Sequence, residues 1–164
     1  MSPSSASTGD ETLDRMLRGG VPTNRSVLVS GGPGAGKSTF GMQFLQAGLD
    51  AGDRALYIST EQTIAELRDS FAAFSFDVDH DDLVFASIHA APGQTVGSGG
   101  EQTLTLQSLG DGSTTNAFTP PFTTEYVIDY LREYAPRDRV VFDSVTGLAP
   151  LSGGEEDRRR TLLD

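Results

Sequence analysis

One segment of the sequence has the residue types and spacing of a phosphate-binding loop. It fits the pattern G-x-x-x-x-G-K-[ST] and reads Gly31-Gly32-Pro33-Gly34-Ala35-Gly36-Lys37-Ser38. In such a loop, glycines let backbone N–H groups turn toward phosphate oxygens, and the following helix adds the partial positive charge of its N-terminal end. Lys37 is the single lysine of the chain, whose other basic residues are all arginines. The segment therefore predicts a nucleotide-phosphate site.

The pattern assigns a role to each polar side chain of the loop. We expect Lys37 to reach the β- and γ-phosphates of ATP, the Ser38 hydroxyl to ligate Mg²⁺, and Thr39 to lie near the α-phosphate. The residues expected to bind the nucleotide are Gly32, Pro33, Gly34, Ala35, Gly36, Lys37, Ser38 and Thr39. The alternative is a glycine turn before a helix without a ligand, and the flanking apolar segments favour the phosphate site.

Two carboxylates elsewhere in the chain complete a predicted catalytic site. Asp143 ends the apolar run 140–142, where a carboxylate can hold Mg²⁺ through water. Apolar runs that end in aspartate are common, so this assignment depends on the loop. Glu61 directly follows another apolar run and can orient and deprotonate the water that attacks the γ-phosphate. The alternative for Glu61 is a glutamate that stabilises a helix N-terminus.

The segments that must position these residues alternate between strand and helix patterns. Strands are predicted at 26–30, 54–59, 83–88 and 139–143. Helices are marked by apolar residues at helical spacing, namely Phe40, Phe44, Leu45 and Leu49, then Ile64, Leu67 and Phe71, then Val127, Tyr130, Leu131 and Tyr134. This order predicts an α/β fold with a mostly parallel sheet between layers of helices.

The chain length favours one domain, which we place at 8–164 after a disordered leader at 1–7. Thr8 and Glu11 have the spacing of a capping box, and Gly19-Gly20 would end the short helix that follows. A segment at about 91–121 is rich in Gly, Ser, Thr and Pro. It is either an inserted loop or β-hairpin near the site, or a disordered surface insertion without function.

Composition limits the environment and the partners. The chain has no cysteine, which excludes disulfides, and its net charge of −11 argues against a nucleic-acid surface. Scarce lysine with abundant Asp and Glu also resembles the proteins of salt-loving archaea, in which acidity is an adaptation to solvent. The N-terminus has no signal-peptide pattern and no apolar run is long enough to cross a membrane. We therefore expect a cytoplasmic protein with no membrane contact.

Several motifs together resemble the KaiC-like branch of the RecA superfamily. They are Thr8-Gly9, Gly19-Gly20-Val21-Pro22, 28–39, 57–62 and 141–148, in matching order and spacing. The resemblance implies a RecA-like P-loop NTPase fold and a catalytic base at Glu61. KaiC has paired glutamates where this chain has Glu61-Gln62, so the second carboxylate is absent. Family members continue with further strands, so we expect a C-terminally shortened chain whose sheet can be incomplete.

The expected function is Mg²⁺-dependent ATP binding with slow ATP hydrolysis in a regulatory or signal-transduction system. The resemblance implies a homo-oligomer of ring or filament type if the C-terminal part is present, and a signalling protein as a further partner. One alternative is an ATP-sensing interaction module that does not hydrolyse ATP. Another is a recombination-type, DNA-dependent ATPase, although the net charge gives no indication of DNA binding.

Overall fold

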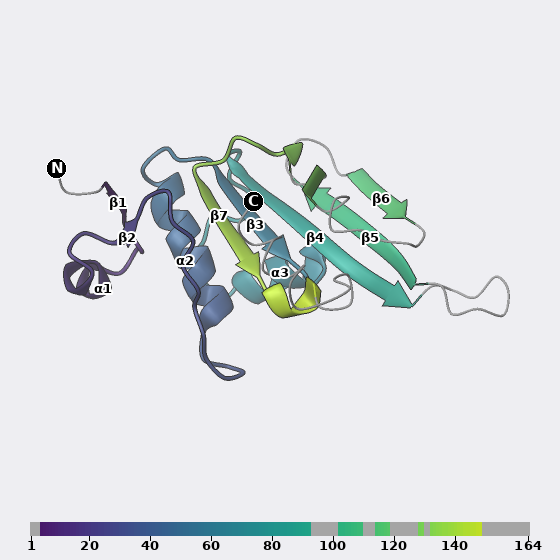
Figure 1. Ribbon diagram of the computed structural model, residues 1–164, viewed down its shortest axis with the longest axis horizontal. Coiled ribbons are helices and arrows are strands. Elements are labelled where there is room, and N and C mark those ends of the chain that lie inside the picture. The colour runs from purple at the N-terminus through teal and green to yellow at the C-terminus, as the bar shows by residue number, and fades with distance from the viewer. Residues whose placement is uncertain (1–3, 93–101, 110–113, 119–127, 130–131, 149–164) are drawn as a thin grey trace, which may run out of the picture.

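The fold is organised around a mixed β-sheet with helices packed on it (Figure 1). The computed structural model describes residues 4–92, 102–109, 114–118, 128–129 and 132–148. Within these residues, one sheet has the order β6-β5-β4-β3-β7, and a separate two-stranded ribbon pairs β1 with β2. The strands are β1 (Ser5–Ala6), β2 (Val21–Pro22), β3 (Ala55–Ser59), β4 (Leu83–Pro92), β5 (Gln102–Leu109), β6 (Thr114–Phe118) and β7 (Arg139–Asp143). The helices are α1 (Glu11–Met16), α2 (Lys37–Leu49), α3 (Ile64–Phe71) and the short 3₁₀ helix η1 (Val145–Leu148).

The centre of the sheet is parallel, as the sequence predicts. Strand β3 pairs in parallel with β4 on one side and with β7 on the other. The register places Ser59 opposite Asp143 in β7 and opposite Ser87 in β4. Because the carboxyl ends of parallel strands meet at one edge, the turns that follow β3 and β7 lie together. Strands β5 and β6, which lie within the segment 91–121, add to β4 in antiparallel pairs.

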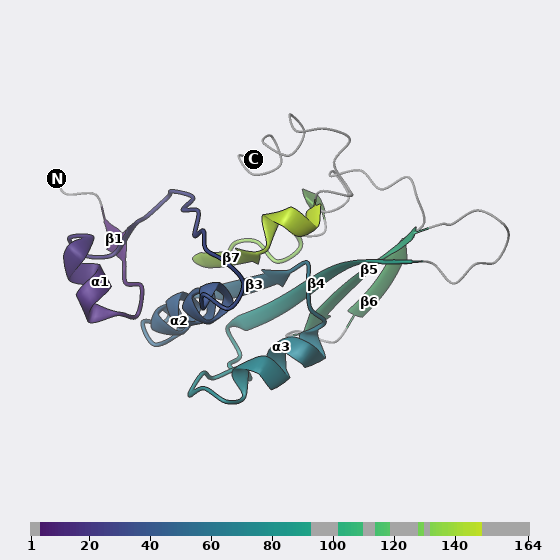
Figure 2. The same cartoon turned by 90° about the horizontal axis from the view of Figure 1, so that it is seen from below.

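The main apolar core lies between the sheet and the helices α2 and α3, which Figure 2 shows on the same side of the sheet. The predicted helical residues Ile64, Leu67 and Phe71 are all buried in it, which confirms that helix. Tyr57 of β3 lies at its centre, with its ring 5.6 Å from that of Phe71 and 5.8 Å from that of Phe85. The opposite face of β3 and β4 is buried as well, through Leu56, Ile58, Val84, Ala86 and Ile88.

The predicted strand at 26–30 is wrong for this structure. Residues 26–30 are not assigned to any strand, and among the described residues no backbone hydrogen bond joins them to the sheet. Val27, Leu28 and Val29 are consequently 58%, 79% and 46% exposed. The physical reason is the lack of a neighbour, because a strand is held by the backbone groups of an adjacent strand. The third predicted helix is described only in part, with Val127, Tyr130 and Leu131 outside the described residues.

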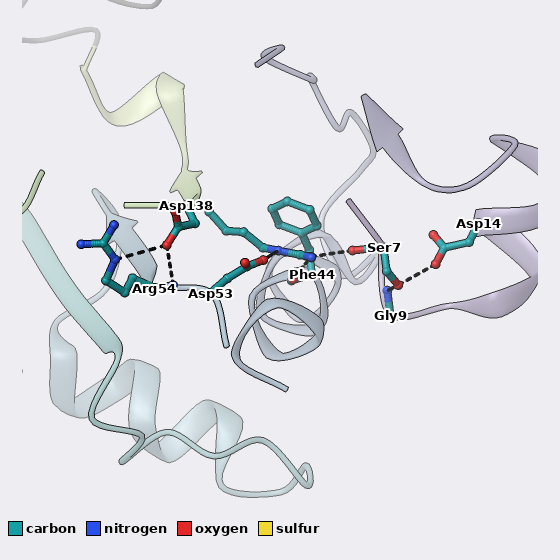
Figure 3. Close-up of polar contacts among 8 residues, drawn as sticks. Ser7, Gly9, Asp14, Phe44, Asp53, Arg54 and Asp138 are labelled. Carbon is teal, nitrogen blue, oxygen red and sulfur yellow. Dashed lines mark hydrogen bonds and ion pairs between the residues drawn. The ribbon is translucent and has the colours of Figure 1, made fainter. Parts of the chain in front are cut away.

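The start of α1 also differs from its prediction. The residue that caps the helix is Asp10, whose side chain accepts a hydrogen bond from the Leu13 N–H at 2.7 Å. Thr8 does not form the expected capping box, because its hydroxyl and its N–H both donate to Asp14, at 2.7 and 2.8 Å. Ser7 donates to the same carboxylate (Figure 3), and these hydrogen bonds hold the pKa of Asp14 below its usual value. The Asp14 carboxylate therefore takes the Thr8 hydroxyl that the capping box would need.

A buried arginine joins β7 to the segments around α2. Arg139 is 6% exposed, and its guanidinium donates to Asp53 Oδ2 at 2.8 Å and to the carbonyls of Ser7 and Phe44 at 2.6 and 2.9 Å. It also lies 4.7 Å from the centre of the Phe44 ring. Figure 3 shows Ser7, Phe44 and Asp53 converging on this point from separate segments. A Cβ at Gly48 would come within 2.4 Å of Arg139 Cδ, so a larger residue there would displace the Arg139 side chain.

We expect Arg139→Met to lower the free energy of unfolding by about 3 kcal/mol, because it leaves Asp53 and two carbonyls without their donor. Urea denaturation monitored by circular dichroism measures the change. The matched control is Arg54→Met, which removes an ion pair to Asp138 whose side chains are 44% and 46% exposed. Its effect should be much smaller. Equal losses in the two variants would show that Arg139 is not a structural centre.

Candidate functional site

The glycine loop before α2 is open and has the backbone conformation of a phosphate cradle. Gly34 and Gly36 have φ values of +75° and +82°, a left-handed conformation that favours glycine. A Cβ built at Gly32, Gly34 or Gly36 would meet no atom within 4 Å, so the space around the loop is free. Residues 31–36 are all exposed. The loop therefore leaves room for a ligand against its backbone.

The N-terminus of α2 opens onto this loop. The helix begins at Lys37, and its N-cap residue Gly36 provides no side chain to accept the first N–H groups. These donors and the helix dipole together favour an anion. Lys37 Nζ donates to the carbonyls of Gly31 and Gly32, both at 2.9 Å, which holds its charge against the loop. The residues present thus fit a phosphate group.

Asp143 lies at the end of β7, where it accepts a hydrogen bond from the Tyr57 hydroxyl to Oδ2 at 2.6 Å. Tyr57 is fully buried, and burial followed by the hydrogen bond to Asp143 raises the pKa of its hydroxyl. Tyr57 therefore stays protonated and serves as a permanent donor. The nearby Ser38 side chain acts in the opposite direction on the same pKa. Tyr57 thus donates to Asp143 and lies near Ser38, the two residues predicted to ligate magnesium.

Glu61 lies in the exposed turn after β3, next to the turn after β7. Its Oε1 accepts from the Ser144 hydroxyl, which is also bonded to the Thr146 hydroxyl, and Thr146 approaches the same oxygen at 3.4 Å. Beneath it, Thr60 connects the two turns: its hydroxyl donates to the Ser144 carbonyl at 2.7 Å and accepts from the Ser144 N–H at 3.1 Å. The carboxylate is therefore fixed in position through one of its oxygens.

The structure brings Glu61 and Asp143 to one edge of the sheet, because Glu61 comes just after β3 and Asp143 ends β7, and the register of these paired strands sets Ser59 opposite Asp143. Sequence reasoning missed the residues that orient them, namely Tyr57, Ser144 and Thr146. Ser144 and Thr146 carry a signal in hindsight, since two hydroxyl residues closely follow Asp143. Tyr57 carries little signal, because a tyrosine inside a buried strand is equally typical of a core residue.

The fold and the loop together define the class of the protein as a RecA-like α/β P-loop domain. A solved structure of a KaiC-like protein from Pyrococcus horikoshii matches it with a TM-score of 0.70 and 21% identity, covering 98% of this chain and 62% of that one. The family model described as "ATPase: KaiC" matches residues 6–164. The chain therefore belongs to the KaiC family of ATPases.

Relatives of known sequence agree with this assignment. A UPF0273 protein of Pyrococcus furiosus is 36% identical over 147 residues, which is 86% of this chain and 54% of that protein. A UPF0273 protein of Saccharolobus solfataricus is 48% identical over 66 residues, or 40% of this chain and 24% of that protein. The chain spans about half the length of the Pyrococcus furiosus relative.

Family membership supports an ATP-binding function of the ATPase type. It also supports the RecA-like α/β fold predicted from the sequence. In the part of the chain that the structure describes, no helix has the length and apolar character needed to cross a membrane.

Proposed function

We propose that this chain binds ATP with Mg²⁺ at the loop 31–39 and hydrolyses it slowly, as the switch of a regulatory system. The observation that carries the proposal is the uncapped N-terminus of α2 behind an open glycine loop, with Lys37 held against that loop. ATP supplies the phosphates that such a site fits. Assembly into a homo-oligomer is part of the proposal, and membership of the family is its support.

The proposed roles are supported by the glycine-loop motif and by the contacts of the side chains. Lys37 would exchange its two carbonyl partners for the β- and γ-phosphates, and the first N–H groups of α2 would donate to the same oxygens. Ser38 and Asp143 would hold Mg²⁺, which when bound neutralises charge on the phosphates. Tyr57 would fix the orientation of the Asp143 carboxylate through its hydrogen bond.

Glu61 would act on the attacking water. Among the described residues, its carboxylate accepts from the hydroxyls of Ser144 and Thr146, both at Oε1. Oε2 is then the oxygen that would orient the water and accept its proton. Holding one oxygen restricts rotation of the carboxylate, so the position of the other is defined before the substrate binds.

The direct test is to measure ATP binding and phosphate release by the purified chain, with Mg²⁺ and with EDTA. The proposal expects Mg²⁺-dependent binding and a slow phosphate release that exceeds a buffer blank. Binding without any release above the blank, at saturating ATP and over a full day, would reject the hydrolysis part. Absence of binding would reject the whole proposal.

A second candidate function is an ATP-sensing interaction module without turnover. The observation that favours it is the engagement of Glu61 by the hydroxyls of Ser144 and Thr146, which occupy Oε1 and leave that oxygen unavailable to an attacking water. In that case ATP should raise the melting temperature of the chain while phosphate release stays at the blank. Release that disappears in Glu61→Gln would instead assign the chain to the enzymes.

We expect Tyr57→Phe to raise the Mg²⁺ concentration needed for half-maximal ATP binding by about tenfold, since Asp143 loses its donor. The ring remains in the core, so the free energy of unfolding should fall by only about 1 kcal/mol. Magnesium titrations of nucleotide binding measure the first effect. Phe85→Leu is the control, because it alters the same core without touching Asp143. If the control raised the required Mg²⁺ concentration by the same factor, Tyr57 would act only through packing in the core.

A further inference from the structure

Strands β3 and β7 end together, and Thr60 extends their connection beyond the last paired residues. The pairing ends with Ser59 opposite Asp143, and the Thr60 N–H still donates to the Asp143 carbonyl at 2.9 Å. The next bonds come from the Thr60 side chain, whose hydroxyl donates to the Ser144 carbonyl at 2.7 Å and accepts from the Ser144 N–H at 3.1 Å. One hydroxyl thus satisfies both backbone groups of Ser144, as a neighbouring strand would. Thr60 therefore holds the turn after β7 to the turn after β3.

The other side of the turn after β3 is held by two buried hydroxyls. Ser59 Oγ accepts from the Gln62 N–H at 3.0 Å, and Ser87 Oγ of β4 donates to the Gln62 carbonyl at 2.9 Å. Ser59 and Ser87 are 1% and 0% exposed, so water does not compete for these bonds. Glu61 lies between Thr60 and Gln62, in a backbone that is fixed on both sides. Its position relative to the turn after β7 is therefore set by Thr60.

The two turns that Thr60 joins have different proposed tasks. Asp143, at the end of β7, is proposed to hold Mg²⁺, and Glu61 to act on the attacking water. Attack on the γ-phosphate requires the metal and the base to be fixed relative to each other. Ser144 links the two, because its backbone follows Asp143 and its hydroxyl donates to Glu61 Oε1. A displacement of Ser144 would consequently move the base while the phosphate-binding loop stayed in place.

We infer that Thr60 is a positioning residue, which keeps Glu61 and Asp143 in a fixed relative position by bonding the Ser144 backbone. Its effect on catalysis rests on the proposed function, because the reaction concerned is the proposed hydrolysis of ATP. The hydroxyl is the group responsible, since both bonds to Ser144 are made by Oγ1. Thr60 acts through Ser144 and Glu61 and would not itself touch the reacting atoms.

The test compares Thr60→Val with Thr60→Ser in single-turnover phosphate release and in ATP binding measured by calorimetry. Valine keeps the shape of the side chain and removes the hydroxyl, whereas serine keeps the hydroxyl. We expect Thr60→Val to lower the rate by about tenfold to a hundredfold, because a small misplacement of a catalytic group has an effect of this size. Thr60→Ser should stay within about threefold of the original rate, and both variants should bind ATP within about threefold of the original dissociation constant.

Thr63→Val is the matched control, because it makes the same chemical change shortly after Glu61. The Thr63 hydroxyl caps α3 through its bonds with Glu66. Loss of a cap destabilises a fold, so the urea midpoint should fall in Thr63→Val as well as in Thr60→Val. The hydrolysis rate should fall only in Thr60→Val. An original rate in Thr60→Val, an equal rate loss in Thr63→Val, or a Thr60→Ser variant as slow as Thr60→Val would overturn the inference.

Amide hydrogen exchange distinguishes failure of this role from failure of the proposed function. Thr60→Val should speed exchange of the Ser144 N–H by about tenfold or more, since its acceptor is lost, and Thr63→Val should not. If the unmodified chain releases no phosphate, the proposed hydrolysis is rejected. Faster exchange at Ser144 in Thr60→Val would then still support the connection of the two turns, and unchanged exchange would overturn it.

Discussion

Lys37→Ala is expected to weaken ATP binding by about a hundredfold or more. The variant removes a side-chain cation that is held against the loop, where Nζ donates to the carbonyls of Gly31 and Gly32. Hydrogen bonds between an ammonium and phosphate oxygens are among the strongest that a site of this kind can form. Isothermal titration calorimetry with ATP and Mg²⁺ measures the loss. The fold should be unaffected, because Lys37 is not one of the residues that form the core in the described part of the chain.

The control for Lys37 is Arg25→Ala, which removes one exposed positive charge outside the glycine loop. It should change the dissociation constant by less than about threefold, since exposed charges are screened by salt. If the two variants bind ATP equally well, Lys37 contributes only to net charge. The phosphate site would then have to lie elsewhere in the chain.

Glu61→Gln is expected to abolish phosphate release while ATP binding is kept. The amide keeps the size of the side chain and a hydrogen bond to Ser144, but it cannot take a proton from water. Loss of a general base lowers rates by about a hundredfold to ten-thousandfold. Single-turnover hydrolysis measures the rate, and calorimetry measures binding. The dissociation constant should stay within about twofold of that of the unmodified chain.

Glu11→Gln is the matched control for Glu61, because it makes the same chemical change in the first turn of α1. It should leave the rate unchanged. A Glu61→Gln variant that hydrolyses ATP at the original rate would remove Glu61 from the mechanism. The alternative interpretation would then hold, in which Glu61 stabilises a helix N-terminus.

The sequence predicted the parts of the fold that depend on local pattern. Helix α3 and strand β7 follow from apolar spacing, and the parallel pairing of β3 follows from the alternation of elements. The strand at 26–30 failed, because its pattern reports the preference of the segment and not the presence of a neighbour to pair with. The cap of α1 failed because Asp14 competes for Thr8.

The candidate site was predictable to a similar degree. The glycine loop is a contiguous motif, so its residues could be named without a structure. Glu61 and Asp143 could be placed at one edge because Asp143 ends one predicted strand and Glu61 comes just after another. Tyr57, Ser144 and Thr146 could not, because their roles arise from side-chain contacts between segments far apart in the chain. Contacts between distant segments leave no recognisable spacing of residues in the sequence.

The central claim is that ATP binds through the loop and the first turn of α2. Amide hydrogen exchange of the purified chain, with and without saturating ATP and Mg²⁺, tests it most directly. The account predicts that ATP slows exchange in residues 32–39, because phosphate oxygens would take up N–H groups that the uncapped helix leaves free. Unchanged exchange in these residues at saturating ATP, or protection confined to another part of the chain, would contradict it.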